Sequence, residues 1–511
     1  MKVALTVNDF LRRAELVYPD RIAIVDDPDQ PANSWGSITY AEMARRARAI
    51  AAGLDALGIA PGERVAMVSH NSARLLTAFF GVSGSGRILV PINFRLSAGE
   101  VDYIVQHCGA RILMVDEDLN DELSSVACET KWVIGDESDS NLMRFDIEPR
   151  QWAVDEDATA TINYTSGTTA RPKGVQLTHR NIWLNASIFG WHMGVSDRDV
   201  YLHTLPQFHC NGWGMLYAVT GMGGRHVIQR KIDGAEILRR VEREGVTLIC
   251  CAPAVLNSVL DAAAEWDGPI PAFGSARIVV AGAAPPTRSI ERCEIELGWE
   301  FVQIYGLTET TPVVTLNRSP LEWQDLEPSE RATRLGRAGV PVIGSIIELD
   351  DEGEVLARGN MVMEGYWQQP DLTELAIRDG FFHTGDGGRI GADNYLAITD
   401  RKKDVINSGA ENVSSLEVED AIFSHPEVAE VAVIGIPDEK WGESVLALVV
   451  KTPGSSLDEE QVIAWVRERL AGFKTPKRVE FRDELARTAT GKLQKFKLRE
   501  PYWVGFERRI N

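Results

Sequence analysis

Hydrophobic and polar positions in the first part of the chain switch between helical and strand-like spacing. A capping box, Thr39-Tyr-Ala-Glu42, opens the amphipathic run Met43–Leu57, and Gly58 marks its end. Three short apolar runs are typical of strands, and a helical pattern at Ala98–His107 separates the second from the third: Arg64–Val68, Leu89–Pro91 and Arg111–Val115. Strand–helix–strand alternation of this kind predicts layered α/β structure.

The pattern changes past Gly391. Strand-like Tyr395–Ile398 leads into the charged, non-periodic stretch Asp400–Asp404, which is the expected domain boundary. Beyond it the spacing predicts a compact α+β unit. Its expected elements are a helix at Leu416–Ser424, a strand at Ala429–Ile436, and a helix opened by a capping box at Ser456-Leu-Asp-Glu459. We therefore expect a large N-terminal domain, 1–400, and a small C-terminal domain, 404–511.

The net charge of the chain limits the classes of function that fit it. The 511 residues include 53 basic and 74 acidic side chains, a net charge of −21, which disfavours a nucleic-acid-binding protein. Residues 471–511 reverse the bias, with 11 Lys and Arg against 5 Asp and Glu, a local +6. This segment is either a solvated tail or a basic element that meets a phosphorylated small molecule.

Cysteine usage and hydropathy bear on the compartment. The six cysteines show no CxxC spacing, which favours a reducing environment. The N-terminus lacks the apolar run of a signal peptide, and no apolar run approaches the roughly 18–20 residues that a membrane span needs. We expect a cytoplasmic protein with no integral membrane segment. The sequence does not decide between a monomer and a homodimer.

The segment Tyr164-Thr-Ser-Gly-Thr-Thr-Ala-Arg-Pro-Lys-Gly-Val175 carries the strongest chemical signal. A strand-like run leads into small and hydroxyl residues, and Lys173 follows. Small side chains let backbone N–H groups approach a phosphate, hydroxyls add donors, and the lysine adds a charge. The segment differs from a Walker A loop, because Pro172 and Gly174 replace its second glycine and its Ser or Thr. It predicts a phosphate-binding loop rather than a flexible linker.

This loop and several later segments resemble, in order and spacing, the motifs of the adenylate-forming enzymes. That family includes acyl-CoA synthetases, luciferases and nonribosomal-peptide adenylation domains. The later segments are Leu205–Trp213, Ala281–Pro285, Tyr305–Thr310, Met363–Trp367, Phe382–Asp386, Arg401–Asp404 with Ser408–Asn412, and Thr488–Lys492. The chain departs from the usual pattern at Ala170, where the family has glycine, and at Ala486, where proline is common. The resemblance implies a layered α/β N-terminal domain of several subdomains and a small, mobile α+β C-terminal domain joined by a hinge at 401–403.

The resemblance also implies roles in binding ATP and Mg²⁺. The β- and γ-phosphates would be held by Thr165, Ser166, Gly167, Thr168, Thr169 and Lys173. Glu309 would ligate Mg²⁺, which prefers carboxylate and phosphate oxygens, and Thr308 would touch the α-phosphate. Tyr305 and Gly306 would contact adenine, with Tyr305 stacked on it, and the backbone of Gly282, Ala283 and Ala284 would line the ring's edge. Asp386 would accept hydrogen bonds from the ribose hydroxyls, and Arg401 would contact the ribose as well.

The C-terminal domain would complete the chemistry. Lys492 would bridge the substrate carboxylate and the α-phosphate, and Lys403 occupies the family's hinge position. The contacts to coenzyme A would come from Gly409, Phe473, Lys474 and Lys477, although some relatives have arginine where Thr475 stands. Small molecules, namely a carboxylic acid, ATP and coenzyme A, are the expected partners.

The acyl pocket would include His209, Trp213, Gly282 and Gly306, and His209 would join Lys492, Thr308 and Glu309 as a catalytic residue. His209 is either a pocket residue or a structural histidine, and Trp213 is either a gate at the pocket mouth or a packed core tryptophan. The chain ends too soon after Lys492 for a carrier domain, and the stretch from Tyr305 to Asp386 is short, which favours a CoA ligase over an acyl-AMP ligase without CoA transfer. The apolar segments expected to wall the pocket contain no charged residue, which disfavours an amino-acid substrate. We expect a medium- to long-chain fatty acid, with a short-chain or aryl acid as the alternative. A homologue that binds nucleotide without turnover is a further alternative.

Overall fold

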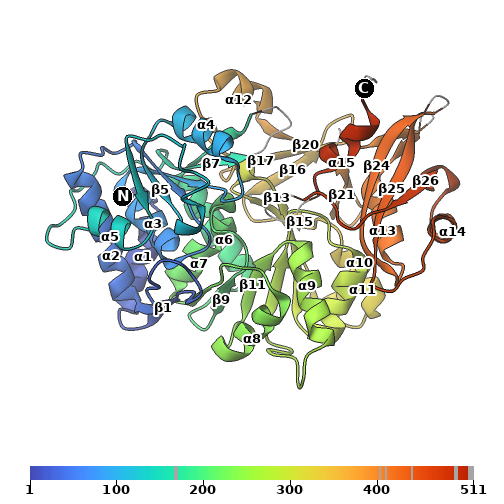
Figure 1. The fold of residues 1–511 in the computed structure, drawn as a ribbon, viewed down its shortest axis with the longest axis horizontal. Coiled ribbons are helices and arrows are strands. Elements are labelled where there is room, and N and C mark those ends of the chain that lie inside the picture. Colours follow the sequence, from blue (N-terminus) through green and yellow to red (C-terminus); the bar gives the residue numbers. More distant parts are fainter. Residues whose placement is uncertain (166–170, 402–403, 409–410, 439–440, 488–492, 505–511) are drawn as a thin grey trace.

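The computed structural model describes residues 1–165, 171–401, 404–408, 411–438, 441–487 and 493–504, and of Arg401 the backbone only. Within these residues the chain forms two large sheets with helices around them, followed by two smaller sheets (Figure 1). None of the described helices is both long enough and apolar enough to cross a membrane.

The first large sheet has nine strands among the described residues, in the order β15-β14-β13-β12-β11-β9-β10-β1-β2. Strands β1 and β9 to β13 run parallel to one another, whereas β2 pairs antiparallel at one end of the sheet and β14 and β15 pair antiparallel at the other. Their bounds are β1 Ile22–Val25, β2 Ser37–Thr39, β9 Val200–His203, β10 Arg225–Ile228, β11 Leu248–Cys251, β12 Arg277–Val280, β13 Glu300–Gly306, β14 Val313–Arg318 and β15 Val340–Pro341.

The second large sheet has seven described strands, in the order β18-β8-β7-β4-β3-β5-β6. Their bounds are β3 Arg64–Val68, β4 Ile88–Ile92, β5 Ala110–Val115, β6 Thr130–Val133, β7 Thr159–Thr165, β8 Lys173–Thr178 and β18 Gly365–Tyr366. The main hydrophobic core lies between the two large sheets and is filled from five helices. These are α1 Asn8–Val17, α2 Tyr40–Ala56, α3 Ala73–Gly81, α6 His179–Met193 and α7 Met215–Met222.

The outer faces of the two sheets have cores of their own. Helices α8 Gly234–Glu244, α9 Pro253–Ala264, α10 Thr287–Arg292 and α11 Pro328–Leu335 cover the first sheet, and α4 Ala98–Cys108 covers the second. Helices therefore flank both sheets in layers. The expected α/β class is confirmed.

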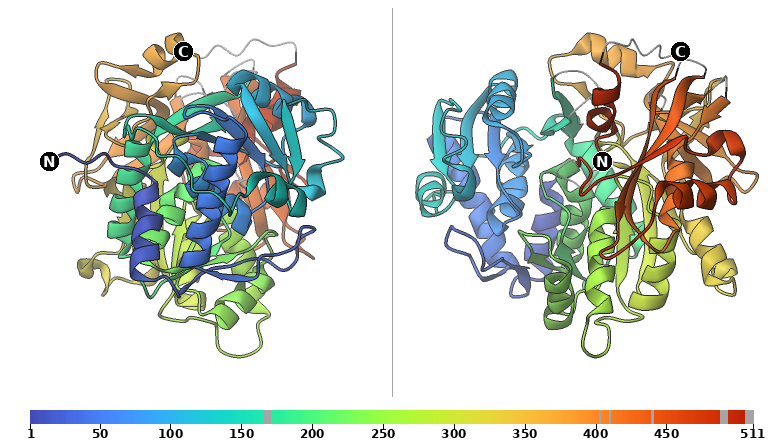
Figure 2. Two further views of the ribbon diagram at one scale, coloured as in Figure 1. Left: turned by 90° about the vertical axis from the view of Figure 1, so that its left-hand side faces the viewer. Right: turned by 45° about the vertical axis from the view of Figure 1, so that its right-hand side comes forward.

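The two smaller sheets follow in the chain. One contains β16 Ser345–Leu349, β17 Glu354–Gly359, β19 Ile377–Arg378, β20 Phe381–Ile390 and β21 Leu396–Arg401. The other contains only strands after Arg401: β22 Ile406–Ser408, β23 Glu411–Val413, β24 Val428–Asp438, β25 Gly442–Lys451 and β26 Arg478–Phe481. Figure 2 shows this last group, orange to red, gathered at one side of the molecule. The small α+β unit expected at the C-terminus is present, packed around helices α13 Ser415–Phe423 and α14 Glu459–Arg467.

Most predicted elements match the structure, and one cap does not. The Thr39 side chain accepts the backbone N–H of Glu42 at 3.2 Å, and α2 begins directly after it. The capping box predicted at Ser456 is wrong, because α14 starts two residues later. Asp458 is its N-cap and Gln461 completes the box, with reciprocal hydrogen bonds of 2.9 Å. Both S-L-D-E and D-E-E-Q fit the N-cap pattern, and Asp caps as well as Ser does.

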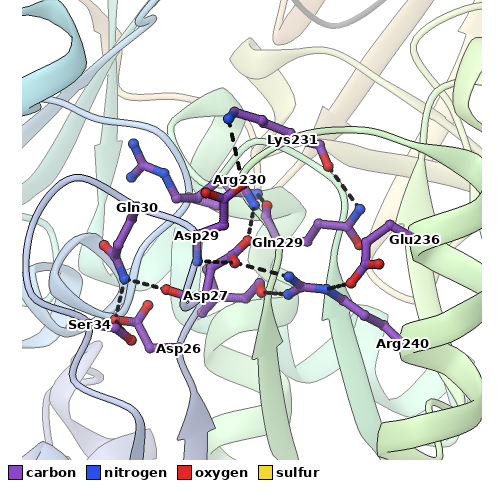
Figure 3. Close-up of polar contacts among 12 residues, drawn as sticks. Asp26, Asp27, Asp29, Gln30, Ser34, Gln229, Arg230, Lys231, Glu236 and Arg240 are labelled. Carbon is purple, nitrogen blue, oxygen red and sulfur yellow. Dashed lines mark hydrogen bonds and ion pairs between the residues drawn. The ribbon is translucent and has the colours of Figure 1, made fainter.

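Buried ion pairs join the two large sheets where their parallel strands end. Arg230, just after β10, makes a bidentate pair with Asp116, just after β5, at 3.0 Å for both bonds. The backbone N–H of Arg230 donates to Asp27 at 2.8 Å, and Asp27 also accepts from Arg240 of α8 at 3.0 Å (Figure 3). Burial on its own would raise the pKa of Asp116, but the hydrogen bonds and charge of Arg230 outweigh it and lower that pKa.

Removal of the Arg230 guanidinium is expected to destabilise the protein strongly. The side chains of Arg230 and Asp116 are each only 4% exposed, so Arg230→Ala leaves a buried carboxylate without its partner. Loss of one member of a buried pair costs about 3–5 kcal/mol. A urea unfolding curve of the variant should show a clearly lower midpoint. Arg45→Ala is the matched control, because Arg45 pairs with Glu42 at the surface, and such pairs contribute about 0–1 kcal/mol. Equal midpoints for the two variants would contradict this role of the pair.

Candidate active site

The expected phosphate loop joins two paired strands. Strands β7 and β8 form an antiparallel hairpin in which Thr165 lies opposite Lys173, so both residues flank the loop at its base. Lys173 places its Nζ atom 4.9 Å from the centre of the Tyr366 ring. Ser166, Gly167, Thr168 and Thr169 lie outside the described residues, and their assignment stays a prediction. Strand β7 is buried continuously from Ala160 to Asn163, and its last two residues, Tyr164 and Thr165, are half-buried where the hairpin reaches the loop.

Glu309 reaches the same place from the first large sheet. It lies in a single turn, Thr308–Thr310, directly after β13, and Thr308 is buried. The phenol of Tyr366 donates to Glu309 Oε1 at 2.9 Å. Burial raises the pKa of Tyr366 above its ordinary value, so this phenol stays protonated and acts as a donor at neutral pH. The two charged groups therefore meet at Tyr366: the Lys173 ammonium lies over its ring, and the Glu309 carboxylate accepts from its hydroxyl.

Asp386 lies on β20 and meets two of the other predicted residues. Its Oδ2 atom accepts a 2.9 Å hydrogen bond from the Tyr305 phenol. Across the β20–β21 pairing, Asp386 lies opposite the backbone of Arg401, whose side chain is outside the described residues. Glu354 holds the preceding turn, because its Oε1 atom accepts the backbone N–H of Gly385 at 2.8 Å. The two residues expected to contact a ribose are thus neighbours, and Tyr305 is bonded to one of them.

The expected adenine segment follows β12. Gly282, Ala283 and Ala284 are exposed, and Gly282 has a left-handed φ of +90° with open space beside it. Gly306 differs, because a Cβ atom there would lie 1.6 Å from the carbonyl oxygen of Pro312. Gly306 therefore permits two backbone segments to meet. Its assignment to the adenine and acyl sites remains a prediction.

His209 and Trp213 sit at either end of an unusual turn. Cys210, Asn211, Gly212 and Trp213 all have left-handed backbone, with φ between 45° and 57°. Trp213 is 4% exposed and belongs to the main core, and His209 is half-buried. Burial of Trp213 agrees with the interpretation as a packed core residue. The assignment of His209 to the acyl pocket remains a prediction.

Buried amides hold this turn against the strand that leads to the phosphate loop. Asn211 Nδ2 donates to Thr161 Oγ1 at 2.9 Å, and Asn163 Nδ2 donates to Asn211 Oδ1 at 3.0 Å. On the far side, Asn185 Nδ2 of α6 donates to the Trp213 carbonyl at 3.1 Å. Asn211 is the residue of this set that the sequence could have indicated, because Asn tolerates the left-handed region better than most residues.

The residues expected to contact coenzyme A lie on the C-terminal unit. Phe473 is exposed, and Lys474 Nζ is 2.6 Å from a carboxylate oxygen of Glu417 on α13. Lys477 is exposed at the end of the same segment. Gly409, Lys403 and Lys492 lie outside the described residues. A phosphate that approached Lys474 would have to compete with Glu417, which is a constraint the sequence did not reveal.

The sequence did not indicate the residues that orient the predicted site residues through hydrogen bonds. Tyr366 lies within a recognised segment and Glu354 lies outside all of them, and only the fold shows which carboxylate or backbone group each of them meets. Another such set lies in the C-terminal unit. Lys495, on the short helix α15 Lys495–Arg499, pairs with Glu419 at 2.7 Å, and Asp400 accepts the backbone N–H of Ser415 at 2.8 Å. These contacts tie α13 both to the end of the large unit and to α15.

Comparison with known proteins identifies the family. The family described as AMP-binding enzyme matches residues 11–367, and its C-terminal domain matches residues 417–492. The chain belongs to the AMP-binding enzyme family. Among similar proteins, a 2-methylpropanoate–CoA ligase of Humulus lupulus is 36% identical, and the match covers 97% of this chain and 95% of that protein. A feruloyl-CoA synthase of Amycolatopsis sp is 34% identical, over 91% of this chain and 94% of its own length.

The fold agrees with the sequence relatives. The crystal structure of an anthranilate CoA ligase in complex with anthranoyl-AMP superposes with a TM-score of 0.88 at 26% identity, covering 99% of this chain and 98% of that one. The expected membership of the acyl-CoA synthetase branch of this family of AMP-binding enzymes is confirmed. The roles of individual site residues remain proposals.

Loss of the Tyr366 hydroxyl should weaken the response of this AMP-binding enzyme to Mg²⁺. Tyr366→Phe keeps the ring next to Lys173 but removes the hydrogen bond that orients Glu309. We expect a rate of acyl-AMP formation about tenfold lower, since one charged hydrogen bond contributes about 1.5–3 kcal/mol, and a higher Mg²⁺ concentration at half-maximal rate. Initial rates measured across a Mg²⁺ titration test this expectation.

Tyr40→Phe provides the control for that experiment. The phenol of Tyr40 is buried and donates to the Gly224 carbonyl, far from Glu309 in the fold. Its loss should lower the thermal midpoint and leave the Mg²⁺ response unchanged. An unchanged Mg²⁺ response in Tyr366→Phe would contradict the positioning role of this phenol.

Proposed function

We propose that the chain activates a carboxylic acid with ATP and transfers the acyl group to coenzyme A. The acid's carboxylate oxygen attacks the α-phosphorus of ATP, the bond to the β-phosphate oxygen breaks, and acyl-AMP and pyrophosphate form. The thiol of coenzyme A then attacks the acyl carbonyl and releases AMP. The observation that supports this most strongly is the meeting of Lys173, Glu309 and Tyr366 at the base of the expected phosphate loop. The Tyr305–Asp386 hydrogen bond, which joins the first large sheet to a smaller one, adds to it.

The residues act mainly by placing charge. Lys173 and Thr165 bind the β- and γ-phosphates, and Thr308 contacts the α-phosphate. Asp386 accepts the ribose hydroxyls, because a carboxylate offers two acceptor oxygens. Tyr305 holds Asp386 from one side, so its ring lies where an adenine can stack on it. Fixed donors and charges of this kind stabilise the charge that develops as the acyl phosphate bond forms.

Glu309 is suited to hold Mg²⁺. Its carboxylate is oriented by Tyr366 at one oxygen, Oε1, and carboxylate and phosphate oxygens are the ligands that this cation prefers. When bound, Mg²⁺ neutralises phosphate charge and orients the leaving pyrophosphate. The role of Tyr366 is to keep the Glu309 carboxylate facing the phosphates.

The C-terminal unit supplies the rest of the proposal. With the chain divided into 1–400, a hinge at 401–403 and 404–511, Lys492 bridges the acyl carboxylate and the α-phosphate during adenylation. A rotation at Lys403 then brings Gly409, Phe473, Lys474 and Lys477 to coenzyme A. In the structure, Thr287 of α10 donates to Asp420 of α13 with its backbone and its hydroxyl, each at 3.0 Å. These bonds would have to break in such a rotation.

For the acid itself, the relatives favour a compact acyl group. The relatives named above are a 2-methylpropanoate ligase and a feruloyl-CoA synthase, and the solved structure holds anthranoyl-AMP. We therefore favour a short-chain or aryl acid. A medium- to long-chain fatty acid is the second candidate, because the apolar segments expected around the pocket carry no charged residue.

An acid panel tests the proposed function. Purified protein is given ATP, Mg²⁺ and coenzyme A with 2-methylpropanoate, ferulate, anthranilate, octanoate or palmitate, and acyl-CoA and AMP are quantified by mass spectrometry. We expect equal amounts of acyl-CoA and AMP with at least one of the first three acids. Preference for octanoate or palmitate would favour the fatty-acid alternative. Acyl-AMP without acyl-CoA would indicate an acyl-AMP ligase, and no pyrophosphate from any acid would contradict turnover.

Lys492 should matter for one half-reaction only. Its ammonium would stabilise charge that exists mainly in the adenylation transition state, and loss of such a donor typically costs about 10²–10³ in rate. Lys492→Ala should therefore form acyl-AMP slowly yet convert supplied acyl-AMP to acyl-CoA at the normal rate. Lys497→Ala, which removes another lysine of the same basic segment, is the control and should behave as the parent protein in both assays. An equal loss of both half-reactions in Lys492→Ala would exclude a step-specific role.

A further inference from the structure

A hollow lies beside the β7–β8 hairpin, next to the site described above. It has a volume of about 660 Å³ and lies between α4 and the start of α12, Pro370–Ala376. Figure 1 shows both helices at the β7 end of the second large sheet. Its lining residues are Tyr103, His107, Arg171, Lys173, Gln368, Gln369 and Leu372. Only Lys173 belongs to the site as assigned so far.

The lining suits an anion. Two of its side chains are permanent cations, Arg171 and Lys173, and none of the lining residues that the structure describes is acidic. A phenol, an imidazole and two amides add hydrogen-bond donors, while Leu372 is the one aliphatic side chain in the lining. The protein as a whole has a net charge of −21, whereas the described lining of the hollow is positively charged. Donors and cations together are the groups that bind phosphate oxygens.

Aromatic rings hold the cations and the imidazole in place. The Arg171 guanidinium lies 5.3 Å from the centre of the Tyr103 ring, and the His107 ring stacks on the same tyrosine at 5.3 Å. His107 Nδ1 is 2.7 Å from the Tyr164 hydroxyl, near the end of β7. With Nδ1 engaged by Tyr164, the other ring nitrogen, Nε2, is the one that can meet a ligand. Tyr103 thus orients two donors of the hollow, and Tyr164 links them to the strand that enters the phosphate loop.

The backbone at the opposite wall is constrained as well. Gln368 has a left-handed φ of +55°, which is uncommon for a residue other than Gly, Asn or Asp. It directly follows Tyr366 and Trp367, and the Trp367 N–H donates to the Gly174 carbonyl at 2.7 Å. This constraint sends the chain back over β8 and places Gln368 and Gln369 across from Arg171. Residues in such conformations are concentrated at ligand sites.

We propose that this hollow binds inorganic pyrophosphate as it leaves the adenylation site. The inference rests on the proposed function, in which Lys173 binds the β- and γ-phosphates. Once the bond to the α-phosphate breaks, the β- and γ-phosphates that Lys173 binds become pyrophosphate. Lys173 lies over the Tyr366 ring and also lines the hollow, so the product can pass from Lys173 to Arg171 and His107.

Binding of pyrophosphate to the protein tests the inference directly. Isothermal titration calorimetry with sodium pyrophosphate and excess Mg²⁺ measures Kd for the parent protein, Arg171→Gln and His107→Phe. Each variant should raise Kd about tenfold, as expected for loss of one charged or strong hydrogen bond. His107→Phe retains the stack on Tyr103, and Arg171→Gln alters an exposed side chain, so both should fold. Arg45→Gln is the matched control, because Arg45 also lies over an aromatic ring, Phe145, at 4.2 Å, yet on α2.

A kinetic arm separates this inference from the proposed function. Pyrophosphate inhibition of acyl-AMP formation should weaken in Arg171→Gln and His107→Phe by the same factor as Kd, while KM for ATP changes little.

If no acid is turned over but pyrophosphate binding depends on Arg171 and His107, the proposed function fails and the anion site stands. If both variants bind pyrophosphate as the parent protein does, the inference is overturned. Weakened binding of adenosine 3′,5′-bisphosphate with unchanged pyrophosphate binding would overturn it as well, and assign the hollow to coenzyme A.

Discussion

The left-handed turn from Cys210 to Trp213 is the constraint on which the arrangement of the site depends. Each non-glycine residue held in sparsely populated backbone regions costs about 1–3 kcal/mol, so the surroundings must enforce the turn. Thr161 and Asn163 of β7 bond Asn211 from one side, and Asn185 bonds the Trp213 carbonyl from the other. A buried amide that loses its hydrogen-bond partner is costly, so loss of one residue of this network destabilises the others.

The same network links the separate parts of the site. Asn163 lies two residues before Thr165, where the phosphate loop begins. Asn185 also accepts the backbone N–H of Val313 at 3.3 Å, just past the turn that carries Glu309. The phosphate loop, the Glu309 turn and the expected acyl wall are therefore positioned by three asparagines and a threonine in one buried cluster. A change in any of these four would displace groups in all three places.

The sequence predicted local structure well and long-range partners poorly. The strand Arg64–Val68 and the helix after Thr39 depend on spacing within a few residues, and the structure reproduces both. The cap at Ser456 failed because two overlapping patterns competed within six residues, and only the packing of α14 chose between them. Arg230 and Asp116 are 114 positions apart, and nothing in either segment indicates the other. Tyr366 was visible as part of a segment, but its bond to Glu309 spans 57 positions and two sheets.

The net negative charge constrains how the proposed site attracts its phosphorylated ligands. With a net charge of −21, the protein as a whole repels ATP, coenzyme A and pyrophosphate, so attraction must come from groups close to each phosphate. At physiological salt the Debye length is about 8 Å, which confines each cation's influence to its immediate surroundings. Lys173, whose Nζ lies over the Tyr366 ring, satisfies both demands. A ring fixes the position of a cation without neutralising it, whereas a carboxylate partner would cancel the charge that the phosphates need. Lys474, paired with Glu417, lacks this advantage, and a ligand there must displace the carboxylate first.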